Sequence, residues 1–176
     1  MPNEPFLTTE RLTLHKPEIA DVWAMLEIVT HPETGRFLGS ANSPAEHFTR
    51  FQRNAGSWFL HGYGSFIVRL RGSGEPVGNC GVFHSFRGLG EDFDDQPEAG
   101  WILRHDQVGR GIASEALTAA LDWFERTHGA RRIVAMIAPI ARKSGASGNR
   151  RSSRSVSRFG AALISSGLTA IARARG

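Results

Sequence analysis

The sequence predicts a mixed α/β fold in which helices flank a central, mostly antiparallel sheet. Two observations lead to this prediction. Residues 98–126 contain a short apolar strand, a turn with two glycines and a long helix with one apolar stripe, as in a strand-helix-strand unit. Residues 65–83 contain two apolar segments around an Arg-Gly-Ser-Gly-Glu turn, which indicates an antiparallel hairpin. With 176 residues, the chain is long enough for one domain with a sizeable core.

The N-terminal third is predicted to form one strand and two helices. Residues 8–15 alternate around Leu12 and Leu14 and are expected to form the first strand. The first helix begins at Pro17 and ends at Pro32, and its apolar residues share one face: Ile19, Val22, Trp23, Leu26 and Val29. Residues 43–46, Ser-Pro-Ala-Glu, form a capping box with proline at the first helical position, and the helix they open loses its apolar pattern by Gly56.

The remaining elements alternate between strands and one long helix. Strands are expected at 65–70 and 76–83, followed by an acidic loop at 90–96 and a strand at 98–103. The helix at 113–127 ends before Gly129, and a last strand occupies 132–137. The helix carries its apolar residues on one stripe: Ala113, Ala116, Leu117, Ala120, Leu121 and Phe124. The resulting order, β-α-α-β-β-β-α-β, favours an antiparallel sheet joined to one parallel strand-helix-strand unit.

The turn between strand and helix has the composition of an anion-binding loop. It reads Val108-Gly109-Arg110-Gly111-Ile112-Ala113. The first backbone N–H groups of a helix have no partner within the helix, and the helix dipole favours negative charge there, so such a turn is suited to phosphates. The alternative is that the two glycines only make a tight connection, since the pattern is not the Gly-x-Gly-x-x-Gly of dinucleotide folds.

This stretch resembles the acetyl-CoA-binding motif of the GNAT superfamily of N-acetyltransferases, Gln/Arg-x-x-Gly-x-Gly/Ala. Gly111 and Ala113 fill the small positions, while Val108 replaces the first Gln or Arg. Residues 98–104 and 114–116 resemble the ribosomal-protein N-terminal acetyltransferase branch, as does the Thr-Glu-Arg-Leu-Thr-Leu opening at 9–14. The hairpin strand at 76–83 also resembles the central hairpin of this family. The resemblance covers residues 7–139.

The resemblance implies a splayed sheet and a set of site residues. The loop would hold the pyrophosphate of acetyl-CoA through its backbone, with charge added by Arg104 and Arg110. This loop comprises Val108, Gly109, Arg110, Gly111, Ile112, Ala113 and Ser114. The backbone of Ile102, Leu103 and Arg104 would pair with the pantetheine arm where the strands splay. Glu98 lies where related enzymes carry a glutamate that deprotonates the amine; the alternative is an ordinary strand-edge glutamate.

The C-terminal segment departs from this family. Eight of the 21 Lys and Arg residues lie between Ile140 and Gly176, a segment without Asp or Glu, so the first 139 residues hold 13 basic and 17 acidic residues. One interpretation is a disordered Arg/Ser-rich tail with regulatory or nucleic-acid roles. The favoured hypothesis is a reading-frame shift near Pro139, because residues 141–147 admit codons that encode Ala-Glu-Lys-Trp-Gly-Phe, a family segment, when read two nucleotides later. The chain is therefore divided into an acetyltransferase domain at 1–139 and an atypical segment at 140–176.

Other features bound the location and the cofactors. The first residues have neither a basic segment nor an apolar core, so no signal peptide is expected, and no apolar run is long enough to cross a bilayer. A single cysteine, Cys80, is expected to be a core thiol, and the protein is expected to be cytoplasmic. The seven histidines show no ligand spacing, so no metal is expected.

The sequence therefore predicts an enzyme that transfers an acetyl group from acetyl-CoA to a primary amine, either a protein N-terminus or a small molecule. Two alternatives are a non-catalytic acyl-CoA-binding or damaged domain and, less favoured, a protein that binds nucleic acid through the basic tail. Related enzymes take a pantetheine-contacting Asn and often a Tyr general acid from the segment that differs here, and the only tyrosine is Tyr63. The acceptor amine and the oligomeric state, including a homodimer, are left open.

Overall fold

The computed structural model describes residues 4–35, 38, 43–137 and 160–164. Its strands form one sheet in sequence order, and every neighbouring pair is antiparallel except β5 and β6, which are parallel. The strands are β1 Leu7–Thr8, β2 Leu12–His15, β3 Ser65–Leu70, β4 Pro76–Phe83, β5 Glu98–Leu103, β6 Ile133–Ile137 and β7 Gly160–Ile164. The helices are α1 Asp21–Thr30, α2 Pro32–Gly35, α3 Pro44–His61, α4 Glu91–Asp94 and α5 Ile112–His128. The predicted mixed fold with a mostly antiparallel sheet is confirmed.

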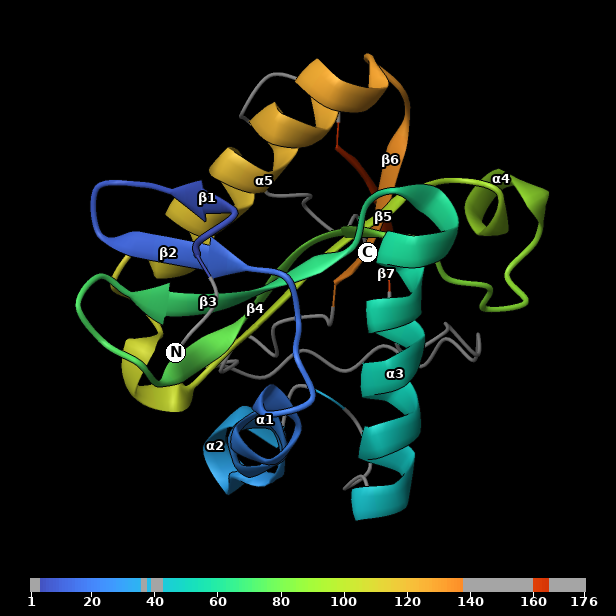
Figure 1. Cartoon of the computed structure of the whole chain (residues 1–176). Coiled ribbons are helices and arrows are strands. Elements are labelled where there is room, and N and C mark those ends of the chain that lie inside the picture. The colour runs from blue at the N-terminus through green and yellow to red at the C-terminus, as the bar shows by residue number, and fades with distance from the viewer. Residues whose placement is uncertain (1–3, 36–37, 39–42, 138–159, 165–176) are drawn as a thin grey trace, which may run out of the picture.

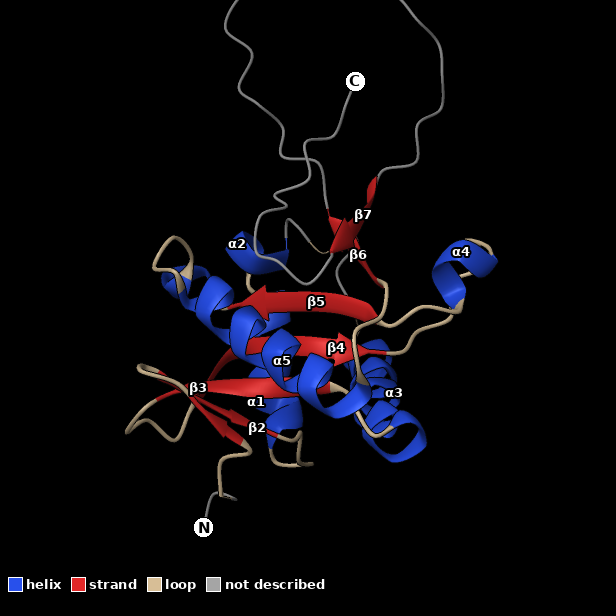
Figure 2. Cartoon of the chain, turned by 90° about the horizontal axis from the view of Figure 1, so that it is seen from above, coloured by secondary structure: helices blue, strands red, loops and turns tan. Residues whose placement is uncertain are grey.

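Two layers of helices enclose the sheet. Figure 1 shows α5 on one side of the sheet and α1, α2 and α3 on the other, and Figure 2 shows α5 running across the face of the central strands. The alternation along β3 follows from this arrangement, because successive side chains of a strand point to opposite faces. Phe66 and Val68 belong to the core under α5, whereas Ile67 packs against Met25 and Ile28 of α1.

The parallel contact between β5 and β6 confirms the predicted strand-helix-strand unit, with α5 as the crossover. The apolar stripe of α5 provides most of the contact with the sheet: Ile112, Ala116, Ala120 and Phe124 are buried, and Leu117 and Leu121 pack beside them. Small residues at positions 116 and 120 let the helix approach the sheet closely. Within the sheet, Gly78 of β4 allows a close approach of β5, because a Cβ at this position would lie 2.2 Å from the carbonyl oxygen of Ile102.

The first predicted strand is wrong in one respect, because residues 8–15 form a hairpin instead of a single strand. The hairpin pairs Leu7 with Leu14 and Thr8 with Thr13. Its turn is closed by the Thr9 N–H, which donates to the Leu12 carbonyl at 2.9 Å, and by the Leu12 N–H, which donates to the Thr9 hydroxyl at 3.0 Å. A threonine hydroxyl that competes for backbone groups favours turns over strands.

Two helix boundaries and one loop also differ from the prediction. The α1 helix begins at Asp21, whose carboxylate accepts a hydrogen bond from the Glu18 N–H and pairs with Arg69 of β3. The α3 helix continues to His61 and ends at Gly62, whose left-handed φ of 76° suits glycine. The acidic loop contains the short α4, which is fixed because Asp94 accepts hydrogen bonds from the N–H groups of Arg87 and Gly90.

Strand β7 lies inside the C-terminal segment that was predicted to be atypical, and its backbone pairs with all of β6. The proposed frameshift point near Pro139 and the codon argument for residues 141–147 lie outside the described residues. In the part of the chain that the structure describes, no helix combines the length and the apolar character needed to cross a membrane.

Candidate active site

The connection between β5 and α5 ends in an uncapped helix N-terminus. Gly109 and Gly111 both have left-handed backbones, with φ of 81° and 76°, which side chains with a Cβ rarely adopt. Gly111 is the residue preceding α5 and provides no side-chain cap. The first backbone bond of the helix runs from the Glu115 N–H to the Gly111 carbonyl at 3.1 Å. The N–H groups of residues 112–114 therefore have no intrahelical acceptor and form an anion-binding end.

The predicted loop residues occupy distinct places around this helix end. Ile112 is buried and anchors the first turn in the core under α5. Val108, Gly109, Arg110, Gly111 and Ser114 are exposed, and Ala113 is half-buried. The loop thus presents an accessible, mostly small-residue backbone beside a fixed hydrophobic anchor.

The parallel strands β5 and β6 diverge next to this loop. Over the described part of β6, only Glu98 with Val134 and Ala99 with Ala135 are paired, although β5 continues to Leu103. The Pro97 carbonyl accepts from the Val134 N–H at 2.9 Å, which fixes the direction of the β5 peptide groups. Because this direction alternates along a strand, the groups of Trp101 and Leu103 also face the β6 side, where no strand among the described residues pairs with them.

The same alternation determines which of residues 102–104, predicted to pair with the pantetheine arm, face β6 and which face β4. The Arg104 N–H donates to the Val77 carbonyl of β4 at 2.8 Å, so the peptide groups of Ile102 and Arg104 face β4. Leu103 faces the divergent side, together with Trp101, which the sequence reasoning did not include. Only the register of β5 against its neighbours identifies Trp101, because a shift of the register by one residue would reverse which peptide groups face β6.

The two predicted basic residues differ in their partners. Arg104 forms two hydrogen bonds with the Asp106 carboxylate, at 2.7 and 3.0 Å, and these raise the pKa of the guanidinium. Arg110 donates to the side-chain oxygen of Gln107 at 2.9 Å, and Gln107 is buried. The charge of Arg104 is therefore balanced locally, whereas Arg110 is held by a neutral amide and keeps its positive charge at the loop surface.

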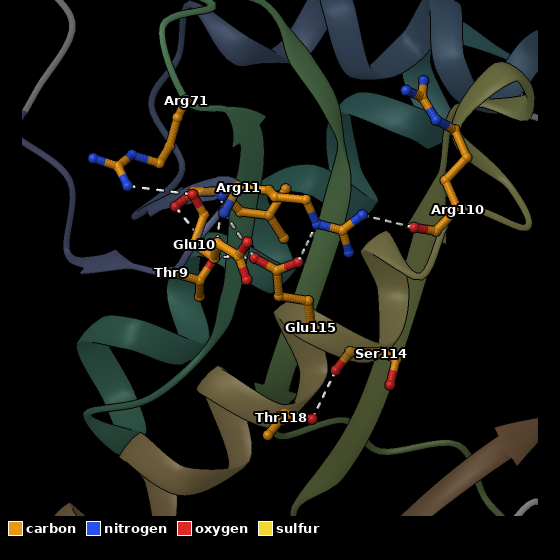
Figure 3. A network of polar contacts seen from close by, with 9 residues as sticks. Thr9, Glu10, Arg11, Arg71, Arg110, Ser114, Glu115 and Thr118 are labelled. Carbon is orange, nitrogen blue, oxygen red and sulfur yellow. Dashed lines mark hydrogen bonds and ion pairs between the residues drawn. The ribbon is translucent and has the colours of Figure 1, made fainter.

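A network from the N-terminal hairpin reaches the first turn of α5 (Figure 3). Glu115 accepts hydrogen bonds from the Thr9 hydroxyl at 2.5 Å, the Arg11 N–H at 2.9 Å and Arg11 Nε at 2.6 Å. Burial by itself raises the pKa of Glu115, but the bonds from Thr9 and Arg11 outweigh it and hold the pKa below its ordinary value. Arg11 and Glu115 belong to the family motifs at 9–14 and 114–116, but no pattern of neighbouring residues predicts that they contact each other.

Glu98 begins β5 on the face opposite α5. Its side chain is buried, and both carboxylate oxygens are engaged: Arg87 donates from Nε and Nη2, each at 2.7 Å, and the Ser85 hydroxyl donates as well. Arg87 and Ser85 were not predicted to be site residues. Glu98 is thus placed in a polar cluster at the end of β4 and the start of β5, where each carboxylate oxygen has a hydrogen-bond donor.

A pocket lies on the same face of the sheet as Glu98, between the sheet and the helices α1 and α3. Its polar lining residues are His47, Arg50, Asn54, Ser65 and Asn79, and its apolar ones are Pro17, Met25, Val29, Phe51, Ile67 and Ile102. Arg53, one residue before Asn54, has a lowered pKa, chiefly because of burial and then because of the charges of Arg87 and Arg50. Three arginines, Arg50, Arg53 and Arg87, therefore lie around this pocket, and Arg87 is paired with Glu98.

Tyr63 and Cys80, whose side chains can act in catalysis, are buried in the core and do not line the pocket. Tyr63 is buried against Phe124 and His128, and burial raises its pKa. Cys80 is buried, and burial raises the pKa of its thiol to about 12, so it is a core thiol without thiolate character. Among the described residues, no three His, Cys, Asp or Glu side chains gather as a metal site requires.

A divergent parallel strand pair beside an uncapped, glycine-led helix is the arrangement expected from the motif, and the sequence comparison agrees. The family model described as "Acetyltransferase (GNAT) domain" matches residues 11–160. The chain belongs to this GNAT acetyltransferase family. It is accordingly an acetyl-CoA-dependent acetyltransferase, as the family and its N-acetyltransferase relatives support.

Solved structures and a curated relative support the same family. An acetyltransferase from Agrobacterium tumefaciens has a TM-score of 0.71 and 28% identity, covering 92% of this chain and 95% of its own. A protein from Bordetella pertussis assigned to the GNAT family has a TM-score of 0.67 and 33% identity, covering 77% of this chain and 80% of its own. The uncharacterized N-acetyltransferase p20 of Bacillus licheniformis is 25% identical over 135 residues, which span 76% of this chain and 73% of that protein.

Proposed function

We propose that this GNAT protein transfers the acetyl group of acetyl-CoA to a primary amine, with the cosubstrate bound between the divergent strands and the α5 N-terminus. One observation carries the proposal: the unpaired β5 edge at Trp101 and Leu103 leads directly into the loop that exposes the N–H groups of residues 112–114. An acyl-CoA has matching parts, namely amide groups along its pantetheine arm and a pyrophosphate at its end. The amides suit a free strand edge, and the pyrophosphate suits a helix N-terminus.

Coenzyme A as the ligand is consistent with a more distant structure of the same fold. A RimL ribosomal L7/L12 α-N-protein acetyltransferase in complex with coenzyme A has a TM-score of 0.57 and 21% identity, covering 78% of this chain and 77% of its own. That level of similarity supports a shared fold. The ribosomal-protein branch therefore rests on the sequence motifs at residues 9–14, 98–104 and 114–116, and we propose it on those motifs alone.

The amine is proposed to enter from the pocket between α1, α3 and the sheet. Ile102 lines this pocket and belongs to β5. The pocket therefore reaches the same strand whose edge toward β6 is proposed to hold the acyl arm. Positive charge from Arg53 favours the neutral form of an amine, which is the reactive form. It also disfavours polycationic acceptors, so we infer an acceptor whose amine lies near a neutral or anionic group.

In the reaction, the amine nitrogen attacks the thioester carbon, the new C–N bond forms and the C–S bond breaks. One proton leaves the amine and one reaches the departing thiolate. We propose that Glu98 receives the amine proton, directly or through water, because it lies on the same face as the pocket. The thiol of coenzyme A has a pKa near that of an ordinary thiol, so it leaves as the thiolate and takes its proton from solvent. Tyr63, which lies in the core, need not supply this proton.

The division of the chain at residue 139 and the frameshift remain proposals. Sequencing the coding region past Pro139 tests the frameshift, because a single-nucleotide correction would restore the family segment. The single buried thiol, Cys80, fits a reducing compartment, and on that basis we propose the cytoplasm as the location.

Two measurements test the function in sequence. Calorimetric titration with acetyl-CoA tests the binding, and the appearance of free coenzyme A thiol tests turnover with a panel of peptides and small amines. Each peptide has a matched control with an acetylated N-terminus, which should give no thiol. Binding without turnover on any amine would favour the non-catalytic acyl-CoA-binding alternative, and absence of binding would refute the proposal.

A further inference from the structure

Arg11 joins two parts of the molecule that lie about a hundred residues apart in sequence. Its Nη1 donates to the Arg110 carbonyl at 2.9 Å, while its Nε and backbone N–H donate to Glu115 at 2.6 and 2.9 Å. Arg110 and Glu115 lie on either side of Gly111. Arg11 of the β1–β2 hairpin therefore forms hydrogen bonds with both the loop and the first turn of α5 (Figure 3). Its Nη2 would lie 3.4 Å from a Cβ at Gly111.

The second feature is the charge of Glu115. A carboxylate in the first turn of a helix is favourable for the helix dipole but repels an anion bound at the same end. Arg11 pairs with this carboxylate directly, so the negative charge is neutralised beside the free N–H groups of residues 112–114. The Thr9 hydroxyl donates to Oε1 of the same carboxylate, while Arg11 Nε donates to Oε2.

Exposure indicates that the pair acts locally. The Arg11 side chain is 46% exposed and that of Glu115 is 19% exposed. An ion pair with one such exposed partner contributes little to global stability, because water screens it. Because Arg11 bonds to residues on both sides of Gly111, it constrains the local conformation of the loop.

We propose that Arg11 is a positioning residue for the cosubstrate: it holds the Arg110 carbonyl and Glu115 together so that the N–H groups of residues 112–114 are presented to the pyrophosphate in a fixed geometry. The role rests on the proposed binding of acetyl-CoA at this helix end. It gives a role to the Thr-Glu-Arg segment at residues 9–11, which is far from the loop in the sequence. The guanidinium is required because it donates to Glu115 and to the Arg110 carbonyl from different nitrogens, whereas Lys has a single ammonium group.

The test compares Arg11→Gln and Arg11→Lys with Arg71→Gln. Arg71 is the matched control, since it donates to the Glu10 carbonyl of the same hairpin at 3.2 Å and is not bonded to the loop (Figure 3). Both Arg11 variants should weaken coenzyme A binding by roughly tenfold or more, as expected for the loss of charged hydrogen bonds. The KM for acetyl-CoA should rise with a much smaller change in kcat, because the lost interaction is present in both ground and transition states.

A second readout does not depend on the ligand. Hydrogen exchange at the Glu115 amide, the first backbone donor of α5, should become faster in the free Arg11 variants and stay unchanged in Arg71→Gln. Unchanged affinity and exchange in Arg11→Gln would overturn the proposal, as would an equal effect in the Arg71 variant. Full recovery in Arg11→Lys would also overturn it, by reducing the role to charge. If the wild-type protein does not bind coenzyme A, the proposed function fails, while the exchange comparison still tests the positioning role.

Discussion

Arg87 binds both carboxylate oxygens of Glu98 from the loop between β4 and α4, with two contacts of 2.7 Å. The Glu98 side chain is only 3% exposed, whereas that of Arg87 is 34% exposed, so the buried carboxylate depends on a partner that reaches it from the surface. This pair links the proposed proton acceptor to a loop whose backbone is fixed by Asp94. Arg87 therefore places Glu98 and limits its freedom to rotate toward a substrate.

Replacing Glu98 with Gln should lower kcat/KM by roughly one hundred to ten thousand fold near neutral pH if the carboxylate accepts the amine proton. The loss should shrink at higher pH, where more of the amine is already deprotonated, and acetyl-CoA affinity should hardly change. Steady-state kinetics at pH 7 and pH 9 measure both effects. Equal losses at the two pH values would assign Glu98 a structural role in its pair with Arg87.

Replacing Arg87 with Met should destabilise the fold because it leaves the Glu98 carboxylate buried with only the Ser85 hydroxyl. The cost should be roughly 1–3 kcal/mol, below the value for a fully buried pair because Arg87 is partly solvated. Urea denaturation measures it, and the double variant with Glu98→Gln should recover part of the loss. Arg132→Met is the control, since the Arg132–Asp92 contact at 3.1 Å is solvent-exposed and should change stability by less than about 1 kcal/mol. Equal losses in the two single variants would contradict the expected difference.

Replacing Gly111 with Glu should weaken acetyl-CoA binding by roughly tenfold or more, because a carboxylate would enter the anion site at the α5 N-terminus. The left-handed φ of 76° adds strain for any residue with a Cβ. Gly72→Glu controls for the strain alone, because Gly72 has a φ of 78° and open space around it in the β3–β4 turn, outside the α5 N-terminus. Calorimetry on the two variants should separate them. A similar affinity in both would reduce the loop to a simple connection.

His47 should make the stability of the fold depend on pH. It is buried, and its pKa lies below the ordinary 6.5, chiefly because of burial and further because of Arg50, while the Val22 carbonyl opposes the shift. As the pH falls below about 6.5, the unfolded chain takes up the proton first, so stability decreases by at most about 1.4 kcal/mol per pH unit from this group. Above that range His47 is neutral in both states and has no such effect.

Urea midpoints of the wild type and His47→Gln at pH 7.5 and 5.5 test this dependence. The variant should lose less stability between the two pH values than the wild type does. His61, whose pKa is also lowered by burial, is present in both proteins and cancels in the comparison. The same pH-dependent loss in both proteins would show that His47 is not responsible.

Replacing Arg53 with Gln should change the preference among acceptors. Two peptide acceptors that differ only by Glu or Lys after the N-terminal residue should be distinguished by the wild type in favour of Glu, and the variant should reduce this ratio several-fold. The ratio of kcat/KM values measures the preference, and Arg126→Gln on the exposed part of α5 is the control. An unchanged ratio in Arg53→Gln would place the acceptor elsewhere.

By itself, the sequence determined the local units of this protein. The apolar stripe of α5 and the Gly109–Gly111 turn predicted the strand-helix unit because helix period and glycine conformation are properties of neighbouring residues. The hairpin of β3 and β4 followed from its alternating pattern and turn in the same way. The extent of the first hairpin was missed, because the Thr9 hydroxyl closes its turn and residues 8–15 alternate like a continuous strand.

Only the tertiary structure decided how the site is completed. The Arg87 pairing with Glu98 joins a loop to a strand, and the Arg11 contacts with Arg110 and Glu115 bring together residues about a hundred positions apart. The choice of Trp101 and Leu103 as the residues facing the divergent edge depends on which strand lies on each side of β5. These features depend on the packing of distant elements, and no pattern of neighbouring residues encodes that packing directly.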